Sequence, residues 1–296
     1  MASGTNGNGA STNGNGHDEW RDSRLQLSDH CAVVTGGARG IGRATAIALA
    51  REGARAIAVV DMSADEVKAF ADKANKYFER EVVFPFAGDV TDGEFRRSVF
   101  ADLESRFGCV SLCVPAAGIT RDRLAVRRDK ETGALDIYPE ELFRRVLDVD
   151  LTAPIYWAMQ TIASVAKHRE SQGLKRWTSA EKIQGVVIFI GSVSSAGNPG
   201  QISYATAKAG LEGAEATLGA EAIFHGLRCA IIHPGYTNTA MVRELGEQFI
   251  EQAILPNTRL HRLIEPEEIA DAICFMIRNA AVSGQLWADA GWRPMA

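Results

Sequence analysis

A tyrosine and a lysine four residues apart carry the strongest chemical signal in the sequence. Tyr204 and Lys208 stand in the segment YATAK, inside a longer stretch that predicts a helix. Residues four apart share one face of a helix, so the Lys208 ammonium is expected near the Tyr204 phenol, where it would lower the tyrosine pKa. Such a tyrosine can pass a proton to or from a substrate oxygen. Ser192, at the end of a predicted strand, is expected to hydrogen-bond the same oxygen.

A glycine-rich segment, TGGARGIG at residues 35–42, is suited to binding phosphate groups. It follows the first predicted strand and begins the first predicted helix, which is the context of a dinucleotide-binding turn. Gly36 permits the tight turn, Gly40 lets backbone amides approach a pyrophosphate, and Gly42 lets the helix pack close to the strand. The segment therefore predicts a dinucleotide site rather than a purely structural turn.

Two side chains of opposite charge bear on the choice between NAD and NADP. Asp61 follows the second predicted strand, where a carboxylate accepts hydrogen bonds from the adenosine ribose and repels a 2'-phosphate. Arg39, inside the glycine turn, favours a 2'-phosphate instead. Asp61 also has a simpler interpretation, as a cap of the following turn. The sequence predicts NAD, with NADP as the alternative.

These residues must be positioned by strands and helices that alternate along the chain. Short apolar runs followed by longer amphipathic stretches are typical of a doubly wound parallel sheet of about seven strands, covered by helices on both faces. The predicted strands are 32–35, 56–60, 82–87, 111–116, 185–190, 227–233 and 285–288, and the predicted helices are 41–52, 65–80, 93–107, 139–168, 204–224 and 266–279. The long polar connections 121–138 and 167–182 are predicted to be surface insertions, the first near a substrate rim.

The composition of the 296 residues fits one large globular domain at 25–296, after a Gly-, Asn- and Ser-rich tail at 1–20 that predicts disorder. A net charge of -5 without a basic stripe argues against nucleic acid as the main partner. No run approaches the roughly 20 apolar residues of a membrane span, so we expect a cytoplasmic protein. The five cysteines predict buried free thiols, and the histidines have no metal-ligand spacing, so we expect no metal site.

Taken together, the motifs resemble the short-chain dehydrogenase/reductase family from about Leu25 to the C-terminus. They are TGGARGIG at 35–42, Asp89-Val90, Ala117-Gly118, Ser192, Tyr204, Lys208 and HPGYTNT at 233–239. The resemblance implies a Rossmann-type sheet, a nicotinamide dinucleotide, and a homodimer or homotetramer. It places Asp89 and Val90 at the adenine, and Pro234, Gly235, Thr237 and Thr239 around the nicotinamide carboxamide. The other cofactor-binding residues that we predict are Gly36, Arg39, Gly40, Ile41, Gly42, Asp61, Ala117, Gly118, Tyr204 and Lys208.

Three positions depart from the pattern of this family. Pro115-Ala116 replaces asparagines that commonly precede Ala-Gly, and Ala290 replaces a common glycine, a change that we expect to be harmless. Asp150 stands where the family usually places an asparagine in a proton relay behind the lysine. It either accepts the same hydrogen bonds and adds charge beside Lys208, or faces away and leaves the relay absent or rebuilt.

The expected activity is NAD-dependent interconversion of a secondary alcohol and a ketone. Tyr204 is the predicted acid/base, Lys208 its electrostatic helper, Ser192 the oxyanion donor and Asp150 a fourth catalytic residue. The resemblance is strongest to 3-oxoacyl carrier-protein reductases, and the small-molecule substrate is expected at 120–138 and 236–262. The resemblance implies a substrate lid in the second segment. Its apolar residues are spaced as on an amphipathic helix, which fits closure over a substrate, contact with a partner subunit or packing into the core. One alternative is a dehydrogenase of sugars, polyols or other hydroxy compounds. Another is a non-catalytic dinucleotide-binding sensor or assembly subunit.

Overall fold

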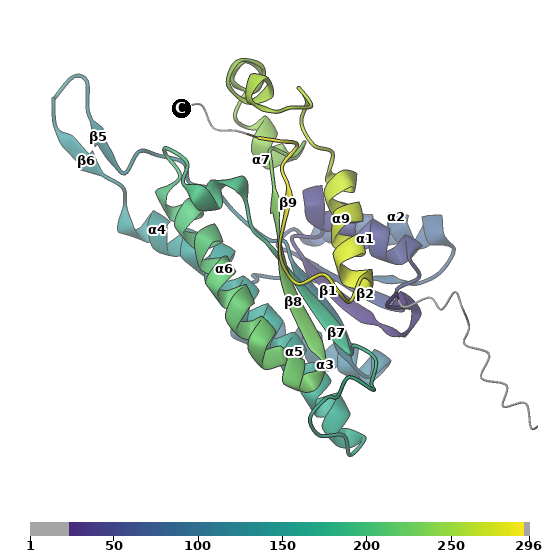
Figure 1. Cartoon of the computed structure of the whole chain (residues 1–296). Coiled ribbons are helices and arrows are strands. Elements are labelled where there is room, and N and C mark those ends of the chain that lie inside the picture. The colour runs from purple at the N-terminus through teal and green to yellow at the C-terminus, as the bar shows by residue number, and fades with distance from the viewer. Residues whose placement is uncertain (1–23, 293–296) are drawn as a thin grey trace, which may run out of the picture.

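The computed structural model describes residues 24–292, so the predicted tail at 1–20 lies outside the described part. A seven-stranded sheet runs through the centre in the order β3-β2-β1-β4-β7-β8-β9, and every neighbouring pair is parallel (Figure 1). Its strands are β1 Cys31–Thr35, β2 Ala56–Asp61, β3 Val83–Ala87, β4 Val110–Pro115, β7 Gly185–Ile190, β8 Leu227–Pro234 and β9 Gly284–Ala288. The predicted sheet is confirmed, with strand ends that differ by about one residue.

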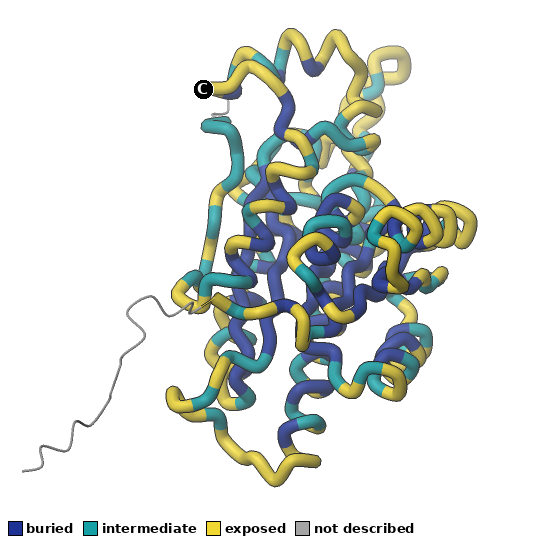
Figure 2. The backbone as a smooth tube through the Cα atoms, turned by 90° about the vertical axis from the view of Figure 1, so that its right-hand side faces the viewer, coloured by how far each residue is buried: buried dark blue, intermediate teal, exposed yellow. Residues whose placement is uncertain are grey.

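The five inner strands form the buried interior because most of their residues are apolar. Every residue of β1, β2, β4, β7 and β8 is buried, and Figure 2 shows that the buried backbone gathers in the interior of the molecule. A parallel strand covered on both faces has no solvent side, which explains the absence of alternation in the sequence.

Helices cover both faces of the sheet (Figure 1). On one face lie α1 Gly40–Arg51, α2 Ala64–Phe78 and α9 Pro266–Arg278, and on the other lie α3 Gly93–Phe107, α5 Ala153–Ser171 and α6 Ile202–Ala222. Each layer buries its own apolar cluster against the strands. None of the helices within residues 24–292 is long and apolar enough to cross a membrane.

The long helix predicted at 139–168 is divided in the structure. It consists of α4 Glu140–Leu147, a π-helical turn Asp148–Thr152, and α5, which continues to Ser171. A π turn inserts an extra residue into the helical ladder and changes the direction in which its side chains point. Asp150 lies in this turn, and its side chain is completely buried.

The first insertion, 121–138, contains two strands that the sequence analysis did not predict. β5 Val126–Arg128 pairs antiparallel with β6 Leu135–Ile137, and the hairpin projects from the body of the protein (Figure 1). Arg123 and Asp136 form an ion pair near its base. Three-residue strands with charged side chains give too short an alternation to be recognised from sequence.

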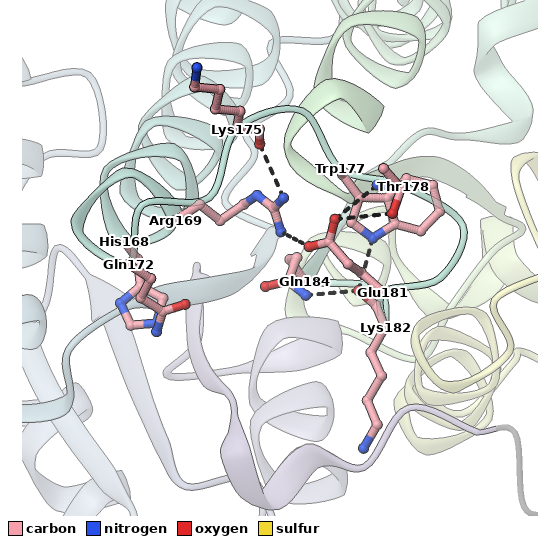
Figure 3. Close-up of polar contacts among 9 residues, drawn as sticks. All are labelled: His168, Arg169, Gln172, Lys175, Trp177, Thr178, Glu181, Lys182 and Gln184. Carbon is pink, nitrogen blue, oxygen red and sulfur yellow. Dashed lines mark hydrogen bonds and ion pairs between the residues drawn. The ribbon is translucent and has the colours of Figure 1, made fainter.

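The second predicted insertion begins later than expected because α5 extends beyond His168 to Ser171. Arg169, 1% exposed, donates to Glu181 at 2.6 Å and to the Lys175 carbonyl at 3.1 Å, and so holds the following connection against the end of α5 (Figure 3). In the same loop the Trp177 indole donates to the Lys182 carbonyl at 3.0 Å (Figure 3). This connection is therefore an ordered structural element.

The stretch 236–262, whose apolar residues are spaced as on an amphipathic helix, is not one continuous helix in the structure. It forms short pieces: α7 Ala240–Arg243, α8 Glu247–Phe249, a π-helical turn Ile250–Ile254 and a 3-10 turn Leu255–Asn257. Gly246, with φ of +89°, interrupts the helical backbone, and Pro256 lies at the start of the last turn. Ile250, Ile254 and Leu263 form a small separate apolar cluster in this region.

Ala290, which we expected to replace glycine harmlessly, adopts a backbone conformation that favours glycine. Its φ is +53°, in the left-handed region that is unfavourable for a residue with a Cβ atom. In this turn after β9 the Arg259 N–H donates to the Ala290 carbonyl at 3.0 Å. The chain therefore retains local strain at a position suited to glycine.

Candidate active site

The glycine turn lies where the direction of chain crossing reverses in the sheet. β1 has β2 on one side and β4 on the other, and ligands of open α/β sheets bind at the carboxyl ends of such a strand pair. Gly36 follows β1 with φ of +62°, and a Cβ atom there would lie 2.7 Å from the Ala117 backbone. Only glycine permits this close approach of the two turns.

Gly40 and Gly42 bring the N-terminus of α1 to the same edge. A Cβ atom on Gly42 would lie 2.3 Å from the Gly36 carbonyl oxygen, so the helix packs directly on the turn. Gly40 has φ of +54° and approaches the Thr239 side chain from the segment after β8. Ile41 packs against the adjoining apolar core. Free amides at a helix N-terminus fit a pyrophosphate.

Asp61 is buried at the end of β2 beside this turn. Its carboxylate accepts from the Ala38 amide at 3.1 Å and from the Met62 amide at 2.8 Å. The contact with Met62 agrees with the simpler capping interpretation, while the contact with Ala38 joins the carboxylate to the glycine turn. Arg39 is exposed, with its Nε atom 4.0 Å from Glu66.

Asp89 and Val90 follow β3 at the next position along the edge. The Asp89 carboxylate accepts from Thr91 at 2.7 Å and from Arg145 at 3.2 Å. Burial acts to raise the pKa of Asp89, but these hydrogen bonds outweigh it and the pKa is lowered. The Val90 carbonyl accepts from the Trp157 indole at 2.9 Å, which fixes this loop against α5.

The segment after β8 completes the edge. The Gly235 amide donates to the Ala288 carbonyl at 3.0 Å, and a Cβ atom on Gly235 would lie 2.7 Å from the Asp289 carbonyl oxygen. Pro234 ends β8, and the Thr237 hydroxyl donates to the Gly235 carbonyl at 3.1 Å. Thr239 caps α7 and approaches Gly40. Apart from Tyr204 and Lys208 on α6, the predicted cofactor residues thus end or follow five strands and lie along one edge of the sheet.

Ser192, Tyr204 and Lys208 meet beyond β7 and at the start of α6. The Ser192 and Tyr204 side chains line the same cavity, and Lys208 Nζ lies 5.4 Å from the centre of the Tyr204 ring. Lys208 is 4% exposed and donates to the Ile190 carbonyl at 3.1 Å. Helix α6 begins two residues earlier than predicted, so Tyr204 lies within its first turn. The predicted juxtaposition of the three side chains is present.

The pKa of Tyr204 is raised, contrary to the direction expected from the sequence. Burial is the largest cause, and it outweighs the lowering effect of the Lys208 charge. Asp150 and Asp122 raise the pKa further, while the hydrogen bond from Ser192 lowers it. The YATAK spacing shows the neighbouring cation but gives no information on burial or on carboxylates from other segments.

Asp150 faces Lys208, which decides between the two interpretations of this residue. Its Oδ2 atom lies 3.4 Å from Lys208 Nζ, and its Oδ1 atom accepts from the Ile119 amide at 2.8 Å. A Cβ atom on Gly118 would lie 2.9 Å from Oδ2, so glycine is needed at this contact. Burial raises the pKa of Asp150 more than Lys208 lowers it.

Comparison with known proteins agrees with this arrangement. A family model described as short chain dehydrogenase matches residues 30–249. The chain belongs to the short-chain dehydrogenase family. Its members are oxidoreductases that bind a nicotinamide dinucleotide, and the predicted family is confirmed.

Individual relatives align with nearly the whole dehydrogenase chain. The 3-oxoacyl-acyl-carrier-protein reductase FabG of Thermotoga maritima is 30% identical over 265 residues, covering 88% of this chain and 96% of its own. The short-chain reductase protein NovJ of Streptomyces niveus is 31% identical over 271 residues, covering 89% and 93%. A short-chain type dehydrogenase/reductase from Mycobacterium marinum has the same fold, with a TM-score of 0.75 at 24% identity over 90% of this chain and 96% of that one.

A cavity of about 80 Å³ opens beside the Ser192 and Tyr204 side chains of the dehydrogenase. Its other lining residues are Thr120, Asp122, Val193, Ser194, Gln201, Gly235, Tyr236, Met241, Val242 and Leu245. Sequence analysis marked the segments 120–138 and 236–262 but did not single out Asp122, Ser194 or Gln201. The only sequence signal for these three residues was that each lies within a few positions of Gly118, Ser192 or Tyr204. Many residues meet that condition, so it could not select individual side chains.

Proposed function

We propose that this dehydrogenase interconverts a secondary alcohol and a ketone, with NAD(H) as its preferred cofactor. The observation that carries the proposal is the position of the Ser192 and Tyr204 side chains on one cavity, with Lys208 buried behind the tyrosine. Two hydroxyl groups on one wall can bind a single substrate oxygen, and one of them can exchange a proton with it.

Each catalytic side chain has a distinct role in this proposal. In reduction, Tyr204 donates its hydroxyl proton to the carbonyl oxygen, and Ser192 donates a hydrogen bond to that oxygen as negative charge develops. Lys208 stabilises the tyrosinate that remains, and Asp150 holds Lys208 in place through their ion pair. A bound nicotinamide dinucleotide supplies the hydride in reduction and accepts it in oxidation.

The residues along the sheet edge fit such a cofactor. Gly36 and Gly42 permit backbone packing that a Cβ atom would prevent, which brings the N-terminus of α1 and its amides to the turn where a pyrophosphate would bind. The Asp61 carboxylate supports NAD, because its charge repels a 2'-phosphate. Arg39 is the residue through which NADP would be selected instead, since its side chain is exposed at the same turn.

We propose 3-oxoacyl thioesters as the first substrate class. The relative from Thermotoga maritima, whose name states a 3-oxoacyl-acyl-carrier-protein reductase, supports this choice. The cavity combines polar walls from Asp122 and Gln201 with apolar residues Met241 and Leu245, which suits a chain that carries both an oxo group and an alkyl segment. Sugars and polyols are the second class, for which the polar wall alone provides support.

The test is turnover by the full chain with a panel of 3-oxoacyl thioesters, ketoses and polyols, assayed in both directions. Tyr204→Phe is expected to lower kcat by roughly 10²- to 10⁴-fold and to weaken NADH binding far less, because the other cofactor-binding residues remain. Tyr77→Phe, on the exposed side of α2, is the matched control and should behave as wild type. Tight NADH binding without turnover of any compound would support the non-catalytic sensor instead.

We also propose a homo-oligomer in which the exposed face of α5 pairs with a second copy. Tyr156 and Met159 on this helix are 48% and 44% exposed, which supports an apolar contact there. Light scattering of the purified chain distinguishes a dimer or tetramer from a monomer.

A further inference from the structure

The segment that leads into β5 of the β5–β6 hairpin, with Asp122 and Arg123, is hydrogen-bonded to the residues that immediately precede α6. The Arg123 amide donates to the Gly200 carbonyl at 2.7 Å. The Asp122 carboxylate accepts from the Gln201 side-chain amide at 2.8 Å. One backbone contact and one side-chain contact therefore fix this side of the hairpin to the start of the catalytic helix.

Tyr138, which follows β6, contacts the first turn of α6. The Tyr138 hydroxyl, after β6, donates to the Arg121 carbonyl at 2.7 Å and lies 2.9 Å from Ser203 Oγ. Because the single hydroxyl proton of Tyr138 is used by Arg121, Ser203 must donate to Tyr138. Tyr138 is 8% exposed and Ser203 is 1% exposed, and Ser203 directly precedes Tyr204.

A second series of hydrogen bonds connects the root of the hairpin, which consists of residues 121–123 and Tyr138, to the Ser192 hydroxyl. Gln201 Oε1 accepts from the Ser194 hydroxyl at 2.8 Å, and the Ser194 amide donates to Ser192 Oγ at 3.0 Å. Ser192 and Tyr204 line the same cavity. Through Gln201 and Ser194, Asp122 is thus connected to the Ser192 hydroxyl of the proposed site.

We propose that the root of the hairpin is a positioning device, in which the Tyr138 hydroxyl fixes the first turn of α6 and thereby aligns Tyr204 with Ser192. This inference rests on the proposed function. Tyr138 is a positioning residue, since it is not among the residues that line the cavity. Proton transfer depends steeply on geometry, so a small displacement of the Tyr204 hydroxyl lowers the rate while cofactor binding is retained.

The pH dependence of turnover reports this alignment. Tyr204 faces Lys208 on its own helix, Asp150 from the π turn, Asp122 from the hairpin root and the Ser192 hydroxyl from the loop after β7. The Ser192 hydrogen bond lowers the pKa of Tyr204, so its loss raises that pKa. The limb of the pH–rate profile that reflects titration of Tyr204, called the pH limb below, then moves to higher pH in both reaction directions.

The experiment compares three variants of the full chain. Tyr138→Phe removes only the hydroxyl, and Ser203→Ala removes the same contact from the α6 side. Both are expected to lower kcat by roughly tenfold or more, to leave the KM for NADH unchanged, and to move the limb to higher pH. Because Tyr138→Phe already breaks the contact with Ser203, the double variant should lose no more than Tyr138→Phe alone.

The matched control shortens the tip of the hairpin and leaves its root intact. Replacing residues 129–134 by Asn-Gly joins the paired ends Arg128 and Leu135 with a two-residue turn. This variant should keep the kcat and the pH limb of the wild type. Circular dichroism establishes that each variant is folded before its kinetics are compared.

The results distinguish a role of the hairpin root from a role of its tip, and both from a failure of the proposed function. Wild-type kcat and pH limb in both folded single variants would overturn the inference while the proposed function stands. An equal loss of kcat on shortening the tip would also overturn it, since the root contacts remain there. A wild-type protein without turnover contradicts the proposed function itself and removes the inference with it.

Discussion

Asp150 and Lys208 form an ion pair inside the protein, with Asp150 Oδ2 3.4 Å from Lys208 Nζ. Asp150 is 0% exposed and Lys208 4%, so solvent screens their charges only weakly. The carboxylate comes from the π-helical turn and the ammonium from α6, two elements that are distant in the sequence. Both charges act on Tyr204, in opposite directions.

Replacing Asp150 by asparagine is expected to move the Tyr204 pH limb to lower pH. The Asp150 charge raises the pKa of Tyr204, and asparagine removes that charge while its side-chain oxygen still accepts from the Ile119 amide. We expect a displacement of about one pH unit in the profile of kcat. Asp148→Asn, an exposed change in the same turn, should leave the limb in place. A limb that does not move in Asp150→Asn would show that Asp150 is uncharged during turnover.

Asp61→Asn is expected to reduce the preference for NADH over NADPH. The substitution keeps an oxygen for the Ala38 amide, so the glycine turn retains this contact, but it removes the charge that repels a 2'-phosphate. We expect the wild type to bind NADH about tenfold or more tightly than NADPH, and the ratio of Kd values to approach one in the variant. Fluorescence titration at fixed ionic strength measures both constants.

The control for this charge is Asp65→Asn, an exposed change in the first turn of α2. It should leave the ratio of the two Kd values unchanged. Tighter binding of NADPH by the wild-type protein would assign cofactor choice to Arg39 and contradict the preference for NAD.

Replacing glycine by alanine should impair NADH binding at Gly42 on α1 but stabilise the protein at Gly213 on α6. Gly42→Ala places a Cβ atom 2.3 Å from the Gly36 carbonyl oxygen, so α1 must move away from the turn and NADH affinity should fall by roughly 10²-fold or more. Gly213→Ala meets no atom within 4 Å and should stabilise α6 by about 0.5–1 kcal/mol. Calorimetric titration and thermal unfolding measure the two effects. Retention of full NADH affinity in Gly42→Ala would argue against a pyrophosphate at this turn.

Ala290→Gly is expected to raise the thermal stability of the protein. Glycine adopts the φ of +53° without the steric cost of a Cβ atom, and the net gain in unfolding free energy should be about 1 kcal/mol. The neighbouring substitution Gly291→Ala should be destabilising, because its φ is +71° and its Cβ atom would lie 2.5 Å from Arg259 Cγ. Differential scanning calorimetry compares the two, and a lower Tm for Ala290→Gly would refute the assignment of strain.

The sequence by itself determined the features that depend on neighbouring residues in the chain. Apolar runs predicted the parallel strands, and the glycines at 36, 40 and 42 predicted the turn between β1 and α1. The spacing of Tyr204 and Lys208 predicted their proximity, because helical geometry places residues four apart on one face. The family resemblance followed from these local motifs, and the comparisons confirm it.

Only the tertiary structure decided the features that depend on burial and on distant segments. Asp150 contacts Ile119 and Lys208 across three separate elements, and Tyr138 reaches Ser203 over 65 positions of the chain. The direction of the Tyr204 pKa also required the fold, because desolvation outweighs the neighbouring lysine. Periodicity describes which face of an element is apolar, but it contains no information on which polar side chains from other elements meet there.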